Sequence, residues 1–316
     1  PHRIEVGCGE GETHVVEGER FLIGVGTRPY RPADVPFNGT SVLDSDEVIE
    51  IDRLPRSLTV LGAGVIGVEY ATIFSALDVH VTLVESRPTI LDFVDRELTD
   101  DFVHQLRDRG VTMRLGCKVE RIAFDRDWPV AVLENGQHVR SQMLLYTGGR
   151  VGATDALNLE ACGLAADNRG RLKVDPNTFQ TEVPHIYAAG DVIGHPSLAS
   201  TSMEQGRVAA CHAFHIPMPP APDFYPYGIY SVPEISTVGM TEQEVRERGI
   251  PYECGIARFR ETSRGHIMGL SAGMMKMIFS LKTKRLLGVH IVGEGATELV
   301  HIGQAVLNLK GMLDYF

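Results

Sequence analysis

The sequence predicts an α/β fold with a parallel sheet, followed by a smaller α+β domain. Three observations predict it. A glycine-rich turn at residues 62–67 stands between a strand-like apolar run and a helical pattern. Short β segments at 119–139 then predict an antiparallel β-meander as a later crossover of the parallel sheet. A proline-rich linker at 217–222 separates these residues from the final α+β segment.

The glycine-rich turn has the G-x-G-x-x-G spacing, with Gly62, Gly64 and Gly67 at its three glycine positions. The first glycine permits the tight turn, the second lets the backbone approach a pyrophosphate, and the third lets the helix pack against the strand. The helix that begins at Val65 and Ile66 offers free N–H groups and the positive end of its dipole to a phosphate. The turn therefore predicts a Rossmann-like dinucleotide-binding domain; a glycine-rich turn with no ligand is the alternative.

Glu85 follows the next strand pattern, 79–84, at roughly the 20-residue distance that a dinucleotide unit requires. An acid at this position is placed to accept hydrogen bonds from the adenosine ribose, and it favours NAD(H) because it repels a 2′-phosphate. Arg87 has two interpretations: it neutralises a 2′-phosphate by a charge-assisted contact, or it is an exposed loop charge. An acid with an adjacent arginine is compatible with the use of both NAD(H) and NADP(H).

The other elements of this domain follow from apolar spacing. Residues 58–61 and 111–115 predict strands on either side of the 79–84 strand. The helix predicted at 65–77 has an apolar side made of Ile66, Tyr70, Ile73, Phe74 and Leu77. A second helix, 96–109, begins after a capping Asp95 and ends before Gly110. The meander segments are 119–124, 130–133 and 138–139, with a hairpin-type turn at 134–136, and residues 143–146 return to an apolar strand.

The segments outside this domain are less regular. Before it, 13–17 and 20–26 predict strands, the second of buried type, and 31–45 predicts a connection. After it, residues 181–191 predict an apolar strand closed by Gly190 and Asp191, and 200–214 predicts a helix. Beyond the linker, strands are predicted at 227–231, 275–279 and 286–292, and helices at 241–248 and 296–309. Leu299, Ile302, Val306 and Leu309 share one face of the last helix.

Composition excludes several classes of protein. The 316 residues are 43% hydrophobic and 22% charged, and the net charge of −11 argues against a general nucleic-acid binder. No apolar run approaches the roughly 20 residues of a membrane-spanning helix. The start, Pro1, without an initiator Met or signal pattern, suggests a chain that begins inside a longer protein. None of the twelve histidines forms an H-x-x-x-H or H-E-x-x-H pattern, so no metal is expected. The five cysteines are expected to be reduced, small, buried residues of a cytoplasmic protein: Cys8, Cys117, Cys162, Cys211 and Cys254.

Five motifs in order resemble those of the two-dinucleotide flavoprotein disulfide reductases, the pyridine nucleotide-disulfide oxidoreductases. They are 24–29, which resembles A-T-G-x-R-P, then the 62–69 fingerprint, Gly149-Arg150, 181–191, which resembles T-x-x-P-x-I-Y-A-x-G-D, and 233–242 at the start of the interface domain. Within the family, residues 196–206, 228–236 and 301–305 are most similar to the soluble pyridine nucleotide transhydrogenases.

The resemblance implies a domain organisation and cofactors. Residues 1–35 and 151–216 would belong to an FAD-binding domain, 36–150 would form the NAD(P)-binding domain with its meander, and 223–316 a truncated dimerisation domain. The implied cofactors are FAD, NAD(H) and NADP(H), and the implied assembly is a homodimer. The family's first glycine fingerprint, its redox disulfide region and its C-terminal H-P-T-x-x-E-like segment are not in these residues.

The resemblance also implies roles for individual residues. Glu69 would lie beside the nicotinamide and the flavin, or else be an ordinary helix charge. Asp191, after Gly190, would hydrogen-bond the ribityl chain of FAD, or cap the following helix. Gly149 and Arg150 would mark the return to the FAD domain. No catalytic residue is predicted in this chain, because hydride passes directly between nicotinamide and flavin.

The sequence leaves three functions open. The main hypothesis is an FAD-dependent transhydrogenase that moves hydride between NADPH and NAD⁺. A dihydrolipoamide dehydrogenase or related disulfide reductase is the alternative within the enzyme class. A catalytically inactive NAD(H)-binding module without flavin is the alternative from another class.

Overall fold

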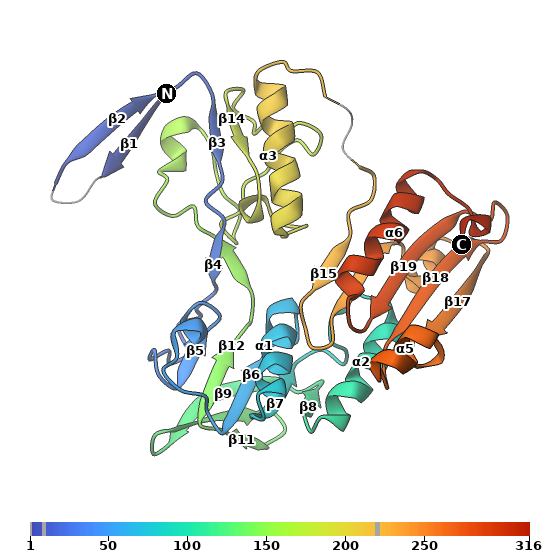
Figure 1. Cartoon of the computed structure of the whole chain (residues 1–316). Helices are drawn as coiled ribbons and strands as arrows, with labels where there is room; N and C mark the ends of the chain where they lie inside the picture. Colours follow the sequence, from blue (N-terminus) through green and yellow to red (C-terminus); the bar gives the residue numbers. More distant parts are fainter. Residues whose placement is uncertain (1, 8–10, 219–221) are drawn as a thin grey trace. The chain divides into compact units, whose positions relative to one another are not determined.

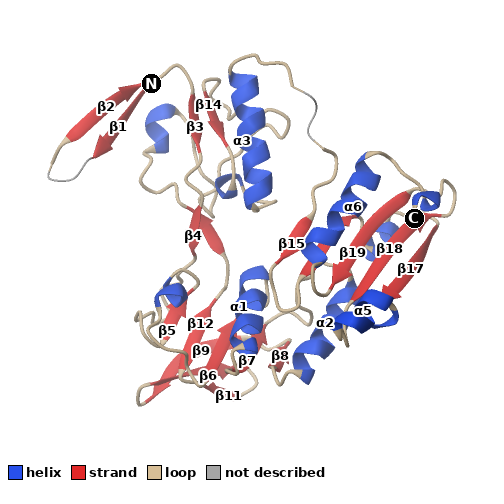
Figure 2. Ribbon diagram, in the orientation of Figure 1, coloured by secondary structure: helices blue, strands red, loops and turns tan. Residues whose placement is uncertain are grey.

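The computed structural model describes residues 2–7, 11–218 and 222–316. The described chain forms two units, the first made of residues 2–30 with 149–218 and the second of 31–148 with 222–316. Figure 1 traces the chain through both, and Figure 2 shows that each mixes helices and strands. The mixed α/β fold predicted from the sequence is confirmed.

A parallel five-stranded sheet forms the centre of the nucleotide-binding part of the second unit. Its order is β5-β12-β6-β7-β8, with β5 at Val42–Asp44, β12 at Met143–Tyr146, β6 at Ser57–Leu61, β7 at His80–Glu85 and β8 at Thr112–Leu115. Each pair is parallel, and Leu61 lies opposite Val84 at the carboxyl ends of β6 and β7. Ligands of open parallel sheets bind at this end of the strands.

The two faces of the parallel sheet are covered differently. Helices α1 (Val65–Ala76) and α2 (Arg96–Asp108) lie on one face, where Val60 and Leu83 join Phe102 in one core. On the other face lies the antiparallel meander of β9 (Val119–Asp125), β10 (Trp128–Leu133) and β11 (His138–Arg140). Its Ala131 and Leu133 pack against Leu61 and Val84. The predicted meander is therefore present, and it replaces a helix layer.

The C-terminal part of the second unit is an antiparallel sheet with order β15-β16-β19-β18-β17. Its strands are β15 (Tyr227–Ile229), β16 (Ile235–Gly239), β17 (Tyr252–Arg258), β18 (Met274–Ser280) and β19 (Leu286–Val292). Its helices are α4 (Glu242–Glu247), α5 (Ser263–Met268) and α6 (Ala296–Asn308). Ile235, Met274 and Val292 belong to the same buried core as α2, so this sheet and the parallel sheet are packed together in one body.

The first unit holds shorter elements. An exposed hairpin joins β1 (Arg3–Gly7) to β2 (Thr13–Glu17), and β3 (Phe21–Ile23) pairs in parallel with β14 (Ile186–Ala188). Strand β4 (Thr27–Pro29) pairs antiparallel with β13 (Arg150–Gly152), and α3 (Ala199–Ala213) packs beside β14 through Tyr187 and Ala209. Short 3-10 turns, in both units, occur at Glu47–Glu50, Leu159–Cys162, Asp191–Ile193, Phe259–Glu261 and Leu313–Tyr315.

Several sequence-based expectations are corrected. On α1 the buried face consists of Gly67, Val68, Ala71, Thr72 and Phe74, whereas the expected Ile73 and Leu77 are exposed. On α6 the expected Leu299, Ile302 and Leu309 are exposed, and Val300, Gly303 and Leu307 face the sheet instead. In both helices a glycine, Gly67 or Gly303, allows close contact with the sheet, and this contact determines which of the apolar side chains are buried.

Other corrections concern segments that carry weak signals. The expected connection at 31–45 contains the edge strand β5, and the strand expected at 20–26 is only three residues long with Leu22 half exposed. The sequence does not predict strands β1, β4, β13, β16 and β17 or helix α5. Four cysteines are free and only partly buried, namely Cys117, Cys162, Cys211 and Cys254, so full burial was wrong for them; Cys8 lies outside the described residues. Within the described chain, no helix has the length and apolarity needed to cross a membrane.

Candidate dinucleotide site

The glycine turn joins β6 to α1 at the carboxyl end of the parallel sheet. Gly62 has a φ of 108°, which favours glycine, and its N–H donates to the Val84 carbonyl at 2.9 Å. A Cβ on Gly67 would lie 1.9 Å from the Gly62 carbonyl oxygen and 2.6 Å from Thr147 Oγ1. Thr147 itself donates from Oγ1 to the Leu61 carbonyl at 2.9 Å. The start of α1 therefore touches the backbone at the end of β6. A residue larger than glycine at position 67 would not permit this contact.

Gly64 differs from the other two glycines because its side is open. A Cβ there would have no atom within 4 Å, and its φ of −75° suits any residue. Gly64 is the N-cap of α1 and has no side chain that could occupy the first N–H groups of the helix. Free N–H groups at a helix N-terminus, with an open approach, are what an anionic pyrophosphate requires. The residues present therefore fit a dinucleotide.

Glu85, at the end of β7, lies directly beside this turn. The residue is 6% exposed, and its Oε2 accepts a hydrogen bond from the Ala63 N–H at 2.7 Å. Arg87 donates to the same carboxylate from its backbone N–H (2.9 Å), from Nε (3.2 Å) and from Nη2 (3.1 Å). Burial raises the pKa of Glu85, but the hydrogen bonds from Arg87 and Ala63 outweigh it and lower this pKa to about 2. Glu85 is thus an ionised acceptor at the position predicted for ribose recognition.

Arg87 is held between two carboxylates. Its Nη1 donates to Asp92 Oδ2 at 2.7 Å, in addition to its contacts with Glu85. The hydrogen bonds that Arg87 donates to Glu85 and Asp92 raise its pKa, although burial opposes them. The side chain is nevertheless 43% exposed, so solvent and solutes reach it. Sequence reasoning identified Arg87 but did not identify Asp92, whose only signal is its place in the loop after Glu85.

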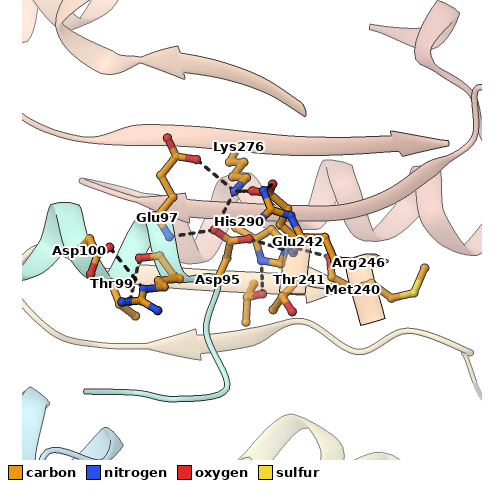
Figure 3. A network of polar contacts seen from close by, with 12 residues as sticks. Asp95, Glu97, Thr99, Asp100, Met240, Thr241, Glu242, Arg246, Lys276 and His290 are labelled. Atoms are coloured by element: carbon orange, nitrogen blue, oxygen red, sulfur yellow. Dashed lines mark hydrogen bonds and ion pairs between the residues drawn. The ribbon is translucent and has the colours of Figure 1, made fainter. Parts of the chain in front are cut away.

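The loop from Ser86 to Asp95 ends at a buried cluster of charges, shown in Figure 3. Asp95 and Lys276 are both fully buried, and Lys276 Nζ donates to Asp95 Oδ1 at 3.0 Å. Lys276 also contacts Glu97 and Glu242. Burial lowers the pKa of Lys276, but its hydrogen bonds to Glu242 and Asp95 outweigh burial and raise it. The lysine therefore stays charged inside the protein.

Asp95 also caps two helices. Oδ1 accepts from the Glu97 N–H of α2 at 3.1 Å, as predicted, and Oδ2 accepts from the Glu242 N–H of α4 at 3.0 Å. One carboxylate thus connects the nucleotide-binding part of the unit to the C-terminal sheet. Lys276 was missed from the sequence, although a charged residue inside the apolar run 274–279 is an unusual signal.

Glu69 lies one turn along α1 and faces the C-terminal part of the unit. Its Oε1 accepts from the Tyr230 N–H at 2.8 Å, and Thr72 Oγ1 accepts from the Val232 N–H at 3.0 Å. Burial raises the pKa of Glu69, with the Tyr230 hydrogen bond opposing it. The segment after β15 is therefore attached to α1 by two backbone N–H groups.

The remaining predicted site residues form a second group, in the first unit. Arg150 donates from Nε to Thr27 Oγ1 at 2.8 Å, and Thr27 donates to Asp191 Oδ2 at 3.3 Å. Gly190 donates its N–H to Gln205 Oε1 at 2.8 Å, and it, not Asp191, is the N-cap of the following 3-10 turn. The following helix, α3, has Leu198 as its N-cap and no side-chain cap, so the expected capping by Asp191 is wrong. Gly149 has a φ of 120° and open space beside it.

The structure thus divides the predicted residues into two sets. The second unit brings Gly62, Gly64, Val65, Ile66, Gly67, Glu85 and Arg87 together around one turn, with Glu69 further along the same helix. The first unit contains Gly149, Arg150, Gly190 and Asp191, and it links Arg150 to Asp191 through Thr27.

Comparison with known proteins agrees with this architecture. Residues 2–206 match the pyridine nucleotide-disulphide oxidoreductase family, and residues 225–316 match the dimerisation domain of that family. A soluble pyridine nucleotide transhydrogenase of Mycobacterium tuberculosis is 48% identical over 316 residues, which are 100% of this chain and 67% of the relative. One from an Enterobacter species is 42% identical over 327 residues, covering 100% of this chain and 68% of the relative. The chain thus spans about two thirds of these relatives.

Solved structures give the same result. The HOCl-induced flavoprotein disulfide reductase RclA of Escherichia coli aligns with a TM-score of 0.90 and 29% identity over 98% of this chain and 71% of that one. LpdA of Mycobacterium tuberculosis aligns with a TM-score of 0.91 and 25% identity over 98% of this chain and 67% of that one. On sequence and on fold, this chain belongs to the pyridine nucleotide-disulphide oxidoreductase family.

Proposed function

We propose that the protein is an FAD-dependent transhydrogenase that moves hydride between NADPH and NAD⁺. The observation that carries the proposal is the likeness to proteins named soluble pyridine nucleotide transhydrogenase, which extends over the whole chain at 42% to 48% identity. The open α1 N-terminus beside an ionised Glu85 and an exposed Arg87 supports it, because the same turn then suits both nucleotides.

In this proposal the nucleotide-binding domain, residues 36–150, holds the pyridine nucleotide. The N–H groups at Val65 and Ile66 bind the pyrophosphate, which approaches across Gly64. Glu85 accepts hydrogen bonds from the hydroxyls of the adenosine ribose. When NADPH is the ligand, the Arg87 guanidinium moves away from a carboxylate partner and binds the 2′-phosphate instead. Glu69, on the same helix, would lie beside the nicotinamide, as the family resemblance implies, with its Oε1 held by the Tyr230 N–H.

Residues 1–35 and 151–216 are proposed as parts of an FAD-binding domain. The Arg150–Thr27–Asp191 chain of hydrogen bonds orients the Asp191 carboxylate after the end of β14, where it would hold the ribityl hydroxyls of FAD. When bound, flavin would supply the two-electron redox chemistry that links the two nicotinamides. Binding and orientation are therefore the work of this chain, and no general acid or base is assigned.

The proposed assembly is a homodimer formed through residues 223–316, in the cytoplasm. The match of 225–316 to the family's dimerisation domain supports the homodimer. The reducing cytoplasm is compatible with the free cysteines of the described chain.

The test is an assay of the full-length protein with NADPH and an NAD⁺ analogue that changes absorbance on reduction. We expect analogue reduction that requires FAD, and no turnover of lipoamide. Lipoamide reduction without transhydrogenation would replace the proposal with a disulfide reductase, the activity named for RclA. A full-length protein with no bound flavin chromophore would instead favour a nucleotide-binding module.

A further inference from the structure

Asp92 has no place in the predicted site, yet it contacts the residue on which 2′-phosphate recognition depends. Its Oδ2 accepts a hydrogen bond from Arg87 Nη1 at 2.7 Å. Arg87 Nε and Nη2 face Glu85 at the same time. The guanidinium of Arg87 is therefore paired with two carboxylates at once. The Glu85 carboxylate is buried, whereas the Asp92 side chain is 54% exposed.

The backbone around these side chains is fixed. The Arg87 carbonyl accepts from the Gly116 N–H at 2.8 Å, and the Leu91 N–H donates to the Ala63 carbonyl at 3.2 Å. Leu91 is buried, and Asp95 anchors the loop end in the Lys276 cluster (Figure 3). Since the backbone is hydrogen-bonded near both residues, a change of partner at Arg87 needs movement of side chains only.

Both nucleotides require Arg87 to move. The Glu85 carboxylate already accepts from Ala63, Ser86 and Arg87, so it accepts ribose hydroxyls only when the guanidinium withdraws. With NAD(H), Asp92 retains the withdrawn guanidinium. With NADP(H), the 2′-phosphate must take the guanidinium from Asp92, because a second anion beside it is repelled.

We propose that Asp92 is a specificity-determining residue, which competes with the 2′-phosphate of NADP(H) for Arg87 and so lowers the preference of the site for NADP(H) over NAD(H). This inference rests on the proposed function, because it concerns the balance between the two nucleotides. Within a transhydrogenase, such a competitor keeps one site usable by both.

The experiment uses the full-length protein and measures dissociation constants by calorimetry for adenosine 2′,5′-bisphosphate and for 5′-AMP. These probes differ only by the 2′-phosphate. Asp92→Asn keeps the shape of the side chain and removes its charge. We expect the ratio of the two constants to shift about three- to fivefold toward the bisphosphate, the size set by one exposed ion pair. The ratio of KM for NADPH to KM for NADH should shift in the same direction.

Two controls separate competition for Arg87 from a general change in charge. Asp100→Asn removes a comparably exposed acid of α2, which pairs with Arg96, and should leave the ratio unchanged. In an Arg87→Ala background, Asp92→Asn should also have no effect on the ratio, since the contested group is gone.

The outcomes are distinct. A shift that persists in the Arg87→Ala background, or that Asp100→Asn reproduces, would overturn the competition. So would an unchanged ratio in Asp92→Asn while Arg87→Ala weakens only the bisphosphate; the proposed function would then survive. If the wild-type protein binds neither probe, both the proposed function and this inference fail.

Discussion

At the scale of single residues, glycine stands at the three positions of the turn for three different physical reasons. Gly62 adopts a positive φ, and Gly67 faces the Gly62 carbonyl so closely that any Cβ collides with backbone. Gly64 has neither constraint: its φ is ordinary and its surroundings are empty. The space beside Gly64 is therefore available to a ligand, and the fold itself does not require glycine there.

This difference predicts opposite effects of two alanine substitutions. Gly67→Ala should lower the free energy of unfolding by about 1–3 kcal/mol, because a backbone contact must open. Gly64→Ala should change it by less than about 1 kcal/mol and still weaken NADH binding by more than roughly tenfold, because its Cβ stands where the pyrophosphate approaches. Urea unfolding and NADH titration of both variants give the comparison. Wild-type NADH affinity in Gly64→Ala would contradict the assigned approach.

Two carboxylates, Glu85 and Glu242, have pKa values far below the ordinary range, and they predict how stability depends on pH. Burial raises both pKa values, but hydrogen bonds outweigh it and lower each to about 2. These hydrogen bonds come from Arg87 and Ala63 to Glu85, and from Lys276 and Tyr252 to Glu242. Both carboxylates are therefore more acidic in the folded chain than in the unfolded one.

A carboxylate with a lowered pKa contributes stability that is complete above its unfolded value of 4.5 and is lost as the pH falls toward 2. We therefore expect the urea midpoint to decrease from about pH 5 to about pH 2.5, and to decrease less steeply in Glu242→Gln. Equilibrium urea unfolding at a series of pH values measures this. A midpoint that is independent of pH across the range would contradict the assignment.

At the scale of elements, one carboxylate organises the contact between two helices. Asp95 caps α2 and α4 and pairs with Lys276 on β18, so three elements meet at a fully buried charge. On the neighbouring strand β19, His290 bonds Thr237 through Nδ1 and the Met240 carbonyl through Nε2, and burial lowers its pKa. These buried polar groups are hydrogen-bonded to one another, which is the condition for burying them.

Removing the buried cation should be far more damaging than removing an exposed one. Lys276→Met leaves the buried Asp95 without its cation, while Glu242 keeps its ion pair with Arg246, and should lower the free energy of unfolding by about 3–5 kcal/mol. Lys118→Met, which breaks the exposed pair with Glu134, should cost less than about 1 kcal/mol. Chemical denaturation of the two variants tests this. Equal losses would show that the buried pair does not hold the elements together.

At the scale of the whole molecule, α6 has an apolar side that the described residues leave exposed. Leu299, Ile302 and Leu309 are 37%, 53% and 82% exposed, in the region that matches the family's dimerisation domain. Exposed apolar side chains gathered on one helix are typical of a surface that another chain covers.

The proposed homodimer can be tested on this helix. Ile302→Asp should convert the full-length protein from dimer to monomer in sedimentation velocity, because it places a charge in an apolar contact. Ile49→Asp, at a residue that is 71% exposed on another element, should leave the dimer intact. A dimer in which Ile302→Asp sediments like the wild type would place the interface elsewhere.

The sequence predicted the parallel sheet, the meander and the glycine turn because each depends on local spacing. It also predicted that Asp95 caps α2, since capping is a contact between near neighbours. It did not predict the partners of that carboxylate, because Lys276 is 181 positions away. It predicted the buried faces of α1 and α6 only in part, through Phe74 and Val306, because Gly67 and Gly303 set how closely helix and sheet approach. Long-range pairs and close packing are properties of the assembled fold.

The Asp95 carboxylate, which both parts of the second unit share, also limits where domain boundaries can be placed in a chimeric protein. A nucleotide-binding domain imported from a relative brings its own residue at this position but meets the resident Lys276 and the first N–H group of α4. Without an acid there, Lys276 loses its buried carboxylate partner, although Glu242 still pairs with it, and the first N–H group of α4 loses its acceptor. We therefore expect a domain exchange that alters nucleotide preference to succeed when residues 31–148 and 222–316 are exchanged together.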